Sequence, residues 1–322
     1  MLIYPLWLTN YSSGTGDDFF KKSFEALGHE VSESRLDHNG CEVDLLERLE
    51  KRKADLIFHV PYTNYFRNEI MDEITRQGNN TMAWQGDDEW LWSSDNVHSP
   101  KFISHAHKWN VTTCSEAVPK YKKIGITPIL AQWGYSASEW KYKNQNRDID
   151  VYFCGARNPE RDKLLKRISG MELNYSFDGP GYGYHKDKKN QSLVSVGING
   201  RPIQGKVSFQ DMVNKYQRAK ISVSLLMGSG KKEAYTQVKQ RVFEIPASGS
   251  FQLASRCPEL ERFFHVGKEI DVFDTEDELE DKINFYLKHD VIRERMAKRA
   301  MFRNSEYSYE KIFQRIFKEV GL

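Results

Sequence analysis

An arginine and a glutamate one helical turn apart, Arg241 and Glu244, give the clearest chemical signal in the sequence. They lie in the segment 220–254, whose pattern predicts a buried strand, a loop rich in glycine and lysine, a helix, a glycine turn and a second strand. A strand, a loop and a helix in this order hold nucleotides at the carboxyl edge of parallel sheets. The segment therefore predicts a nucleotide site, in which the guanidinium group can bind an anion.

Two further arginines follow another predicted strand, at 150–154. Gly155 begins the loop after this strand, Arg157 lies within the loop, and Arg161 lies in the first turn of the helix predicted over 160–169. The helix dipole disfavours a cation in the first turn, so an anionic ligand would account for its presence there. We expect these arginines to lie at the carboxyl edge of their sheet.

Two glycine loops are further candidates for a ligand site. The first follows the N-terminal apolar segment and contains Gly14, Thr15 and Gly16, but it lacks the third glycine of the dinucleotide fingerprint. Its small residues fit either a close approach of a ligand to the backbone or a plain tight turn. The second loop contains Lys231 and Lys232, which could neutralise a phosphate group, although a solvated lysine loop has the same composition.

Two acids, Asp87 and Asp88, follow the strand predicted over 81–85. An acid at the carboxyl end of such a strand could take a proton from an acceptor hydroxyl group. The same side chains could instead cap backbone amides of the loop. The sequence predicts no metal site, because the Asp-Asp-Glu order matches a metal-binding Asp-x-Asp motif poorly and the four cysteines form no Cys-x-x-Cys pair.

Composition limits the class of protein. The 322 residues are 39% hydrophobic, which suits two domains of ordinary size, and no apolar run approaches the roughly 20 residues of a membrane span. The apolar N-terminal run lacks a basic start and predicts a buried strand in place of a signal peptide. The scattered cysteines argue against a disulfide scaffold and indicate the cytosol.

The order of the predicted elements indicates two α/β domains. Strands and helices alternate in the first half, and the alternation begins again after a polar stretch at 141–147 that has no apolar anchor. Residues 1–145 hold 16 basic and 20 acidic residues (net −4), and the remainder holds 31 and 25 (net +6). The basic second half suits a phosphorylated ligand, although a solvated surface would have the same charge.

Segments along the second half resemble the CgeB-like (spore maturation protein) group of glycosyltransferases, within the wider group-1 glycosyltransferases. The segments that carry the resemblance are RVFEIPASGSFQLAS at 241–255, CPELERFFHVGKEIDVFDTEDELEDKINFYLKH at 257–289 and EYSYEKIFQRI at 306–316. Two earlier segments, TMAWQGDDEW at 81–90 and VYFCGARNPERDKLL at 151–165, are similar to the family in the same order. The resemblance spans most of the chain, and its C-terminal part is the most specific.

The resemblance implies a donor site for a nucleotide sugar, and we expect a UDP-sugar. Glu244 matches the acid that binds the ribose hydroxyl groups, and Arg241 with Arg157 and Arg161 would bind the diphosphate. Group-1 enzymes also carry an earlier acid seven residues away, which has no clear counterpart here, so a retaining and an inverting outcome both stay open. The other implied donor positions are Gly155, Gly249 and Ser250 beside the phosphates, and Lys206 and Val207 beside the base.

The family's GT-B fold implies two doubly wound, Rossmann-like domains that face each other across a cleft. Residues 1–145 would form the acceptor domain and residues 146–304 the donor domain, with the C-terminal helix in 305–322 crossing back to the first domain. Such enzymes usually need no metal cofactor, because cations and helix N-termini stabilise the departing diphosphate.

The acceptor and two other classes of function stay open. The acceptor could be a glycan, a protein, a small molecule or a modified DNA base, as in phage DNA modification. Tryptophans could stack on an extruded base, but the net negative charge of residues 1–145 disfavours duplex DNA. The candidate tryptophans are Trp84, Trp90, Trp92, Trp133 and Trp140. The other classes are a non-catalytic nucleotide-sugar-binding or structural protein, and a sugar-nucleotide epimerase. The sequence does not predict an oligomeric state.

Overall fold

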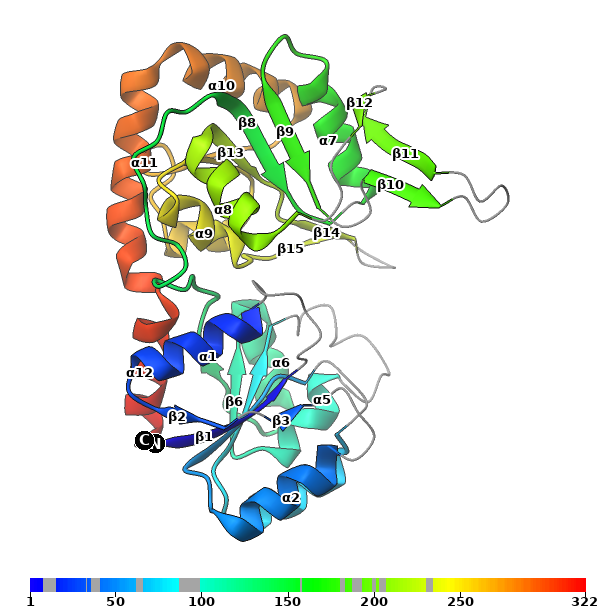
Figure 1. Ribbon diagram of the computed structural model, residues 1–322, viewed down its shortest axis with the longest axis vertical. Helices are drawn as coiled ribbons and strands as arrows, with labels where there is room; N and C mark the ends of the chain where they lie inside the picture. Colours follow the sequence, from blue (N-terminus) through cyan, green and yellow to red (C-terminus); the bar gives the residue numbers. More distant parts are fainter. Residues whose placement is uncertain are drawn as a thin grey trace. The chain divides into compact units, whose positions relative to one another are not determined.

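The computed structural model divides the chain into two compact units, each built around a parallel sheet (Figure 1). Unit 1 comprises Met1–Glu139 and Tyr307–Leu322, and unit 2 comprises Trp140–Glu306. The described residues are 1–7, 16–32, 34–35, 41–61, 66–86, 99–156, 158–179, 183–186, 193–198, 201–202, 207–229 and 234–322.

The sheet of unit 1 has the strand order β2-β1-β4-β5-β6-β7, and β3 also pairs with β1. All of these pairs are parallel. The direction of strand addition reverses between β1 and β4, and ligands of such sheets bind beyond the carboxyl ends at this point. The strands are β1 (Leu2–Trp7), β2 (Glu30–Val31), β3 (Ser34–Arg35), β4 (Leu56–His59), β5 (Thr81–Gln85), β6 (Trp109–Thr112) and β7 (Ile129–Leu130).

Helices cover both faces of this sheet, which explains why every residue of β4 is buried. On one face Ile57 packs with residues of α2 and α3, such as Leu45 and Met71. On the other face Phe58 packs against the aromatic rings of α1 and α12. The helices of unit 1 are α1 (Gly16–Ala26), α2 (Cys41–Lys51), α3 (Asn68–Arg76), α5 (Pro100–Ile103), α6 (Val118–Lys123) and α12 (Tyr309–Val320).

The C-terminal helix α12 belongs to the core of unit 1, as predicted. Phe313 is fully buried and lies with its ring centroid 5.4 Å from that of Phe20, 4.4 Å from that of Phe24 and 5.8 Å from that of Trp84. Ser308 caps the helix by accepting a hydrogen bond from the Lys311 amide. Segments that are almost 300 residues apart in the sequence therefore form one aromatic cluster, which joins α12 to α1 (Figure 1).

The main sheet of unit 2 has the order β17-β16-β13-β8-β9, and all four pairs are parallel. Strand addition reverses between β8 and β13, so their carboxyl ends form the switch point of this sheet. The strands are β8 (Ile149–Cys154), β9 (Tyr175–Asp178), β13 (Ala219–Ser224), β16 (Phe251–Ser255) and β17 (Asp271–Phe273). The helices are α7 (Pro159–Ser169), α8 (Phe209–Arg218), α9 (Arg241–Ala247), α10 (Glu276–Lys288) and α11 (Asp290–Asn304).

Unit 2 also contains short antiparallel strands outside the main sheet. They form a three-stranded sheet, β10-β11-β12, and a two-stranded sheet, β14-β15. Their bounds are β10 (Gly183–Lys186), β11 (Leu193–Ile198), β12 (Arg201–Pro202), β14 (Met227–Ser229) and β15 (Ala234–Thr236). Within the described residues, no helix has the length and apolar character needed to cross a bilayer.

The two faces of the unit 2 sheet differ in polarity. Val151 and Phe153 of β8 belong to an apolar core that includes residues of α7 and α10. The alternate residues Tyr152 and Cys154 point to the opposite face, because side chains alternate along a strand. There the ring of Tyr152 lies 4.6 Å from the ring of Tyr216 of α8, centroid to centroid. This second face carries the polar groups of the candidate site.

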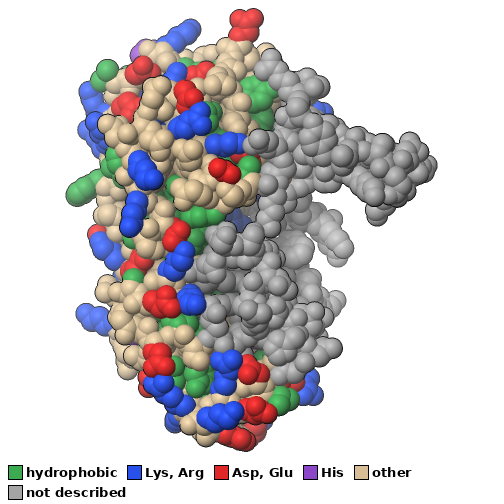
Figure 2. Space-filling model, in the orientation of Figure 1, with side chains coloured by type: hydrophobic (Ala, Val, Ile, Leu, Met, Phe, Trp, Pro, Cys, Tyr) green, Lys and Arg blue, Asp and Glu red, His purple; other side chains and the backbone are tan. Residues whose placement is uncertain are grey.

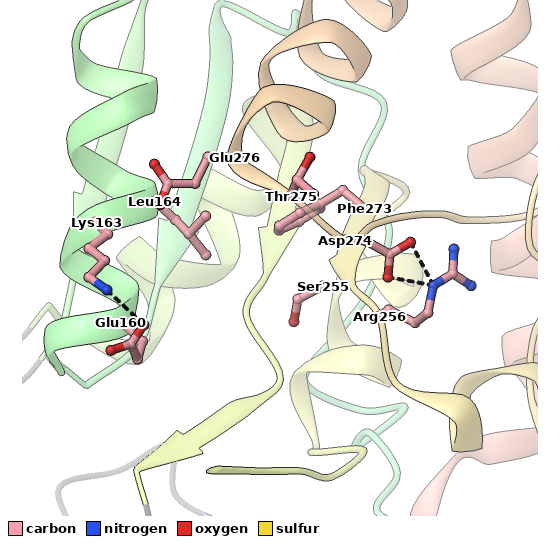
Figure 3. Close-up of a pocket in the computed structure, with 9 residues that line it drawn as sticks. All are labelled: Glu160, Lys163, Leu164, Ser255, Arg256, Phe273, Asp274, Thr275 and Glu276. Carbon is pink, nitrogen blue, oxygen red and sulfur yellow. Dashed lines mark hydrogen bonds and ion pairs between the residues drawn. The ribbon is translucent and has the colours of Figure 1, made fainter.

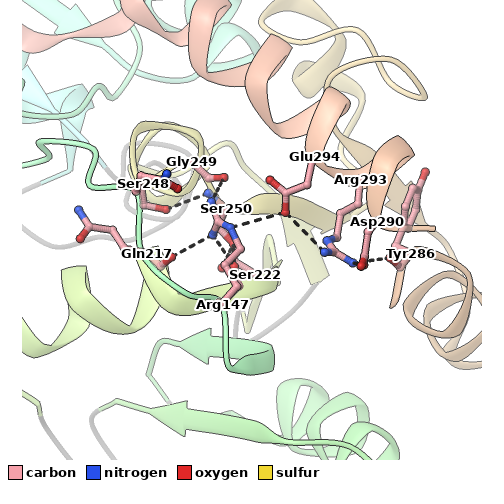
Figure 4. Close-up of polar contacts among 12 residues, drawn as sticks. Arg147, Gln217, Ser222, Ser248, Gly249, Ser250, Tyr286, Asp290, Arg293 and Glu294 are labelled. Atoms are coloured by element: carbon pink, nitrogen blue, oxygen red, sulfur yellow. Dashed lines mark hydrogen bonds and ion pairs between the residues drawn. The ribbon is translucent and has the colours of Figure 1, made fainter. Parts of the chain in front are cut away.

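The polar stretch 141–147, predicted to have no apolar anchor, is held to unit 2 by Arg147 (Figure 4). The guanidinium group donates to the carbonyl oxygens of Gln217 at 3.0 Å, Ala219 at 2.6 Å and Gly249 at 2.5 Å. These carbonyls lie just after or at the C-terminal ends of α8 and α9, where a cation is favourable. Trp140, before this stretch, is also buried and contacts Tyr216.

Candidate functional site

The carboxyl edge of the unit 2 sheet brings two glycines into unusually close contact. The amide of Gly155, directly after β8, donates to the carbonyl oxygen of Asp178 at 2.9 Å. Gly179, directly after β9, has φ +142°, and a Cβ atom there would lie 2.0 Å from the Gly155 carbonyl oxygen. Only glycine fits this position, because any Cβ atom would collide with the Gly155 backbone.

Arg241 and Glu244 lie in the first turns of α9, at the same carboxyl edge. The carboxylate of Glu244 is buried, with 5% of the side chain exposed, and one of its oxygens accepts a hydrogen bond from Gln240 Nε2 at 3.0 Å. Arg241 is 27% exposed, its Nε lies 3.9 Å from the second oxygen of Glu244, and its Nη1 donates to the Tyr216 hydroxyl group at 3.1 Å. The predicted pair is therefore adjacent, and the guanidinium group is oriented by Tyr216.

Burial raises the pKa of the Glu244 carboxyl to about 7, although the Arg241 charge and the Gln240 hydrogen bond both act to lower it. A carboxyl with this pKa is only partly ionised at neutral pH. Ligand groups that donate hydrogen bonds to it would favour the carboxylate form, and a pair of vicinal hydroxyl groups does so.

An ion pair that the sequence did not predict lies beneath this edge. Asp178 is fully buried, its two oxygens lie 3.0 and 2.8 Å from Lys215 Nζ, and it also accepts from the Tyr152 hydroxyl at 2.8 Å. Tyr152 packs on Tyr216, which contacts Arg241. A row of polar and aromatic side chains thus connects the end of β9 with the start of α9. The only sequence signal for Asp178 was its place before a glycine-rich loop.

Arg161 occupies the first turn of α7, as predicted, but its guanidinium group binds backbone. Nη1 donates to the carbonyl oxygen of Ala156 at 2.7 Å, and Nη2 donates to that of Leu225 at 3.3 Å. Asn158 caps the helix by accepting from the Arg161 amide at 2.8 Å. The side chain therefore ties the loop after β8 to the end of β13, and its charge lies at the switch point.

A pocket of about 460 Å³ opens at the carboxyl edge on the apolar face of the sheet (Figure 3). It lies between the first turns of α7 and α10 and beyond the ends of β16 and β17. Two ion pairs line it, Glu160 with Lys163 and Arg256 with Asp274. The pocket includes none of the predicted donor residues. Its two cations each pair with an acid, and Glu276 adds a further negative charge.

Gly249 and Ser250 lie at the opposite end of the sheet, in contrast to the predicted place beside the phosphates. Gly249 follows α9 and has φ +77°, and its carbonyl oxygen accepts a hydrogen bond from Arg147 (Figure 4). Ser250 precedes β16, and its hydroxyl lies 2.7 Å from that of Ser222. The amino ends of the strands meet at this edge, so the two residues stabilise the turn from α9 into β16. The predicted phosphate contact is corrected accordingly.

Several predicted positions lie outside the described residues. Val207 is described and is half-buried just before α8, and Gly16 is described as the first residue of α1. In the described parts of the chain, no group of three or more His, Cys, Asp or Glu residues could hold a metal ion. The positions outside the described residues are Gly14, Thr15, Asp87, Asp88, Arg157, Lys206, Lys231 and Lys232.

Comparison with known proteins finds a similar family and similar folds. The model of a family described as glycosyl transferase-like matches residues 161–318, which include α9 and the Arg241–Glu244 pair. The prediction of a glycosyltransferase is borne out. No curated protein matches the sequence significantly.

Solved structures resemble the chain over its whole length at low sequence identity. Anabaena Alr3699/HepE in complex with UDP-glucose has a TM-score of 0.68 and 10% identity, covering 100% of this chain and 99% of that one. Sucrose-phosphate synthase from Thermosynechococcus elongatus has a TM-score of 0.69 and 11% identity, covering 99% of each chain. T4 phage BGT in complex with UDP-glucose has a TM-score of 0.59 and 14% identity, covering 100% of both. These likenesses confirm the predicted GT-B fold.

Proposed function

We propose that the protein transfers a sugar from a UDP-sugar to a hydroxyl group of an acceptor, as a CgeB-like glycosyltransferase. The observation that carries this proposal is the buried Glu244 carboxylate beside Arg241 at the start of α9. A carboxylate accepts hydrogen bonds from both hydroxyl groups of a ribose, and an adjacent guanidinium group binds a diphosphate. HepE and T4 phage BGT, each solved with UDP-glucose, have the same fold and support UDP as the nucleotide.

In the proposed reaction, the acceptor oxygen forms a bond to the anomeric carbon of the sugar while the bond from that carbon to the phosphate oxygen breaks. The electron pair of the broken bond leaves with UDP. Arg241, Arg161 and Arg157 stabilise the negative charge that develops on the diphosphate. The proton of the acceptor passes to a carboxylate, for which we propose Asp87 or Asp88.

We further propose that the transfer needs no metal ion, since arginine side chains can supply the positive charge. T4 phage BGT has been solved in complex with UDP and Mn²⁺. Every assay should therefore be run both with and without added Mn²⁺. A cytosolic location is proposed because Cys41, Cys114, Cys154 and Cys257 are all buried free thiols, which suits a reducing compartment.

A modified DNA base remains a candidate acceptor. T4 phage β-glucosyltransferase, described as a DNA-modifying enzyme, shares the fold at 14% identity. Duplex binding to this chain should weaken steeply with salt if DNA is the acceptor, since phosphate contacts release counterions. Absence of binding at low salt would remove DNA and leave glycan, protein or small-molecule acceptors.

A thermal-shift screen with UDP, GDP, ADP and CMP tests the proposed donor site. A nucleotide at about 100 times its Kd stabilises the native state by roughly 2.7 kcal/mol, which raises the melting temperature. UDP should give the largest shift, and Glu244→Ala should abolish that shift while its own melting stays cooperative. An equal shift in Glu244→Ala would show that UDP binds elsewhere.

Assays of UDP-sugars without an acceptor separate the transferase from the other two classes. A transferase hydrolyses its donor slowly because water replaces the acceptor. An epimerase would interconvert free donors, and a non-catalytic binding protein would change neither. The transferase proposal fails if neither hydrolysis nor transfer is measured with any donor that shifts the melting temperature.

A further inference from the structure

One face of α11 exposes large apolar side chains to solvent. Val291 is 72% exposed, Ile292 is 40% exposed and Phe302 is 84% exposed. Exposed cations occupy the positions between them. These cations are Arg295, Lys298 and Arg299.

The six side chains form a continuous surface, named here the α11 face. At 3.6 residues per turn they fall within an arc of about 120° around the helix axis. The two acids of the helix, Asp290 and Glu294, fall outside this arc, and each lies within ion-pair distance of Arg293. The α11 face therefore carries a charge of three cations and no anion.

The cations of the α11 face differ from the neighbouring arginines of the same helix. Arg293 pairs with Asp290 at 2.6 Å, and Arg303 pairs with Glu269 at 2.7 Å. Among the described residues, no carboxylate lies within ion-pair distance of Arg295, Lys298 or Arg299. Together with Phe302 and Glu269, these three cations line a hollow of about 320 Å³. Figure 2 shows blue and protruding green side chains along the left edge of the molecule, where Figure 1 places α11.

A partner of this face must offer both negative charge and apolar contact. A second copy of the chain, docked by the same face, would bring like charges together. A nucleic acid backbone would neutralise the cations, but it offers no apolar surface to the aliphatic Val291 and Ile292. The surface of an anionic bilayer offers both, because phosphate headgroups lie directly above the acyl boundary.

We propose that the α11 face docks the protein on anionic membrane surfaces. The apolar side chains lie at both ends of the cation cluster, about 16 Å apart along the axis between positions 291 and 302. When the helix lies flat on a bilayer, the apolar side chains at both ends of the cluster can insert into the bilayer together, while the cations between them contact lipid headgroups. The proposal is independent of the donor and acceptor, since docking requires neither.

Co-sedimentation with vesicles tests the proposal in the full chain. The probes are phosphatidylcholine vesicles with and without about 30% phosphatidylglycerol, at low and at physiological salt. We expect binding to the anionic vesicles alone, and weaker binding as salt rises. The triple variant Arg295→Glu, Lys298→Glu, Arg299→Glu should lose on the order of 100-fold in partition constant, since each cation adds roughly fivefold.

A matched control carries the same change of charge elsewhere. Lys51, Lys122 and Lys123 are exposed lysines of unit 1, and their replacement by glutamate should leave most of the binding intact. Phe302→Ser changes no charge and should weaken binding by about tenfold, because an inserted ring is lost. Thermal melting of each variant confirms that it folds.

Three results would overturn the proposal. The first is no binding to anionic vesicles even at low salt, and the second is an equal loss in the control triple variant. The third is that the protein binds duplex DNA through the three α11 cations but does not bind vesicles. This result would make the α11 face a nucleic-acid-binding surface.

Discussion

Glu244 is buried, although its proposed function needs its negative charge. The pKa of the carboxyl is raised from 4.5 to about 7 in the folded protein. Because the folded pKa lies above the unfolded one, the contribution of this group to stability is complete below about pH 4.5 and is lost as the pH rises through about 7. Above about pH 7 the ionised Glu244 carboxylate therefore lowers the stability of the free protein, and hydrogen bonds from a bound ribose can offset this free-energy cost.

The affinity for UDP should consequently increase with pH. If the ionised carboxylate binds the ribose, the Kd for UDP should fall about tenfold between about pH 6 and about pH 8, following the ionised fraction. Isothermal titration calorimetry at a series of pH values measures this Kd. Glu244→Gln should bind weakly with no such pH dependence, and Arg241→Gln should move the midpoint upward, because a charge that lowers the pKa of Glu244 is removed. The same pH dependence in Glu244→Gln would assign it to another group.

Gly179 and Gly28 allow a test of the close approach between the ends of β8 and β9. Both have positive φ, but a Cβ atom at Gly28 meets nothing within 4 Å, whereas one at Gly179 would collide with the Gly155 backbone. Gly28→Ala should cost roughly 1 kcal/mol from backbone conformation alone. Gly179→Ala should cost at least about 3 kcal/mol or displace the loop after β8, with loss of UDP binding. Urea unfolding and UDP titration measure both, and equal effects would contradict the steric argument.

At the scale of elements, Arg147 shows how one side chain holds several helices in place. Its guanidinium group satisfies carbonyls at the ends of α8 and α9 and at the start of β13. Burial lowers the pKa of Arg147, but the group remains charged. The same helices present Tyr216 and Arg241 at their site-facing positions. Arg147 therefore orients, from the opposite edge, the elements that form the candidate site.

Arg147→Met should destabilise unit 2 by roughly 2–4 kcal/mol, because three carbonyl groups lose a charged donor. Arg218→Met provides the control, since Arg218 pairs with Asp148 on the surface, where 37% and 46% of the two side chains are exposed. Loss of that pair should cost less than about 1 kcal/mol. Urea unfolding of the two variants measures the difference in their free energies of unfolding. Equal losses of stability would show that Arg147 stabilises unit 2 no more than a surface ion pair does.

Local patterns predicted most strands of the two parallel sheets and the place of α9, since hydrophobic runs and glycine turns are encoded within short segments. The short antiparallel strands β10, β11, β12, β14 and β15 were not predicted. The Arg241–Glu244 pair was likewise predicted, because both residues belong to one helix turn. Contacts between distant segments were missed. Asp178 and Lys215 are 37 residues apart, and Arg147 and Gly249 are 102 apart, so no local pattern joins them. Gly249 was misplaced because its order in the sequence does not say at which end of the sheet it lies.

At the scale of the whole molecule, the chain enters unit 1, forms unit 2 and returns to unit 1 as α12. The returning helix brings five core residues, among them Phe313, whose ring contacts residues of α1, β4 and β5. Unit 1 is thus built from both ends of the sequence, whereas unit 2 is continuous.

Phe313→Ala should weaken unit 1 by about 3–5 kcal/mol, as expected for a fully buried phenylalanine. Hydrogen exchange should accelerate at the amides of β4 and β5, while β8 and β13 keep their protection and UDP still binds. Phe302→Ala, which removes an exposed ring of α11, should change stability by less than about 0.5 kcal/mol. Equal loss of protection in β13 would mean that the two units unfold together.

The return of α12 also sets the order in which the protein matures on the ribosome. Domains fold as they emerge, and synthesis runs at about 5–20 residues per second. Unit 2 is complete once residue 306 has emerged, whereas unit 1, although translated first, lacks Phe313 and its neighbours until the last helix follows. For that interval the rings of Phe20, Phe24 and Phe58 have no partner from α12. The nascent N-terminal unit therefore exposes these rings until synthesis ends, and premature termination would release a chain with a finished unit 2 and an unfinished unit 1.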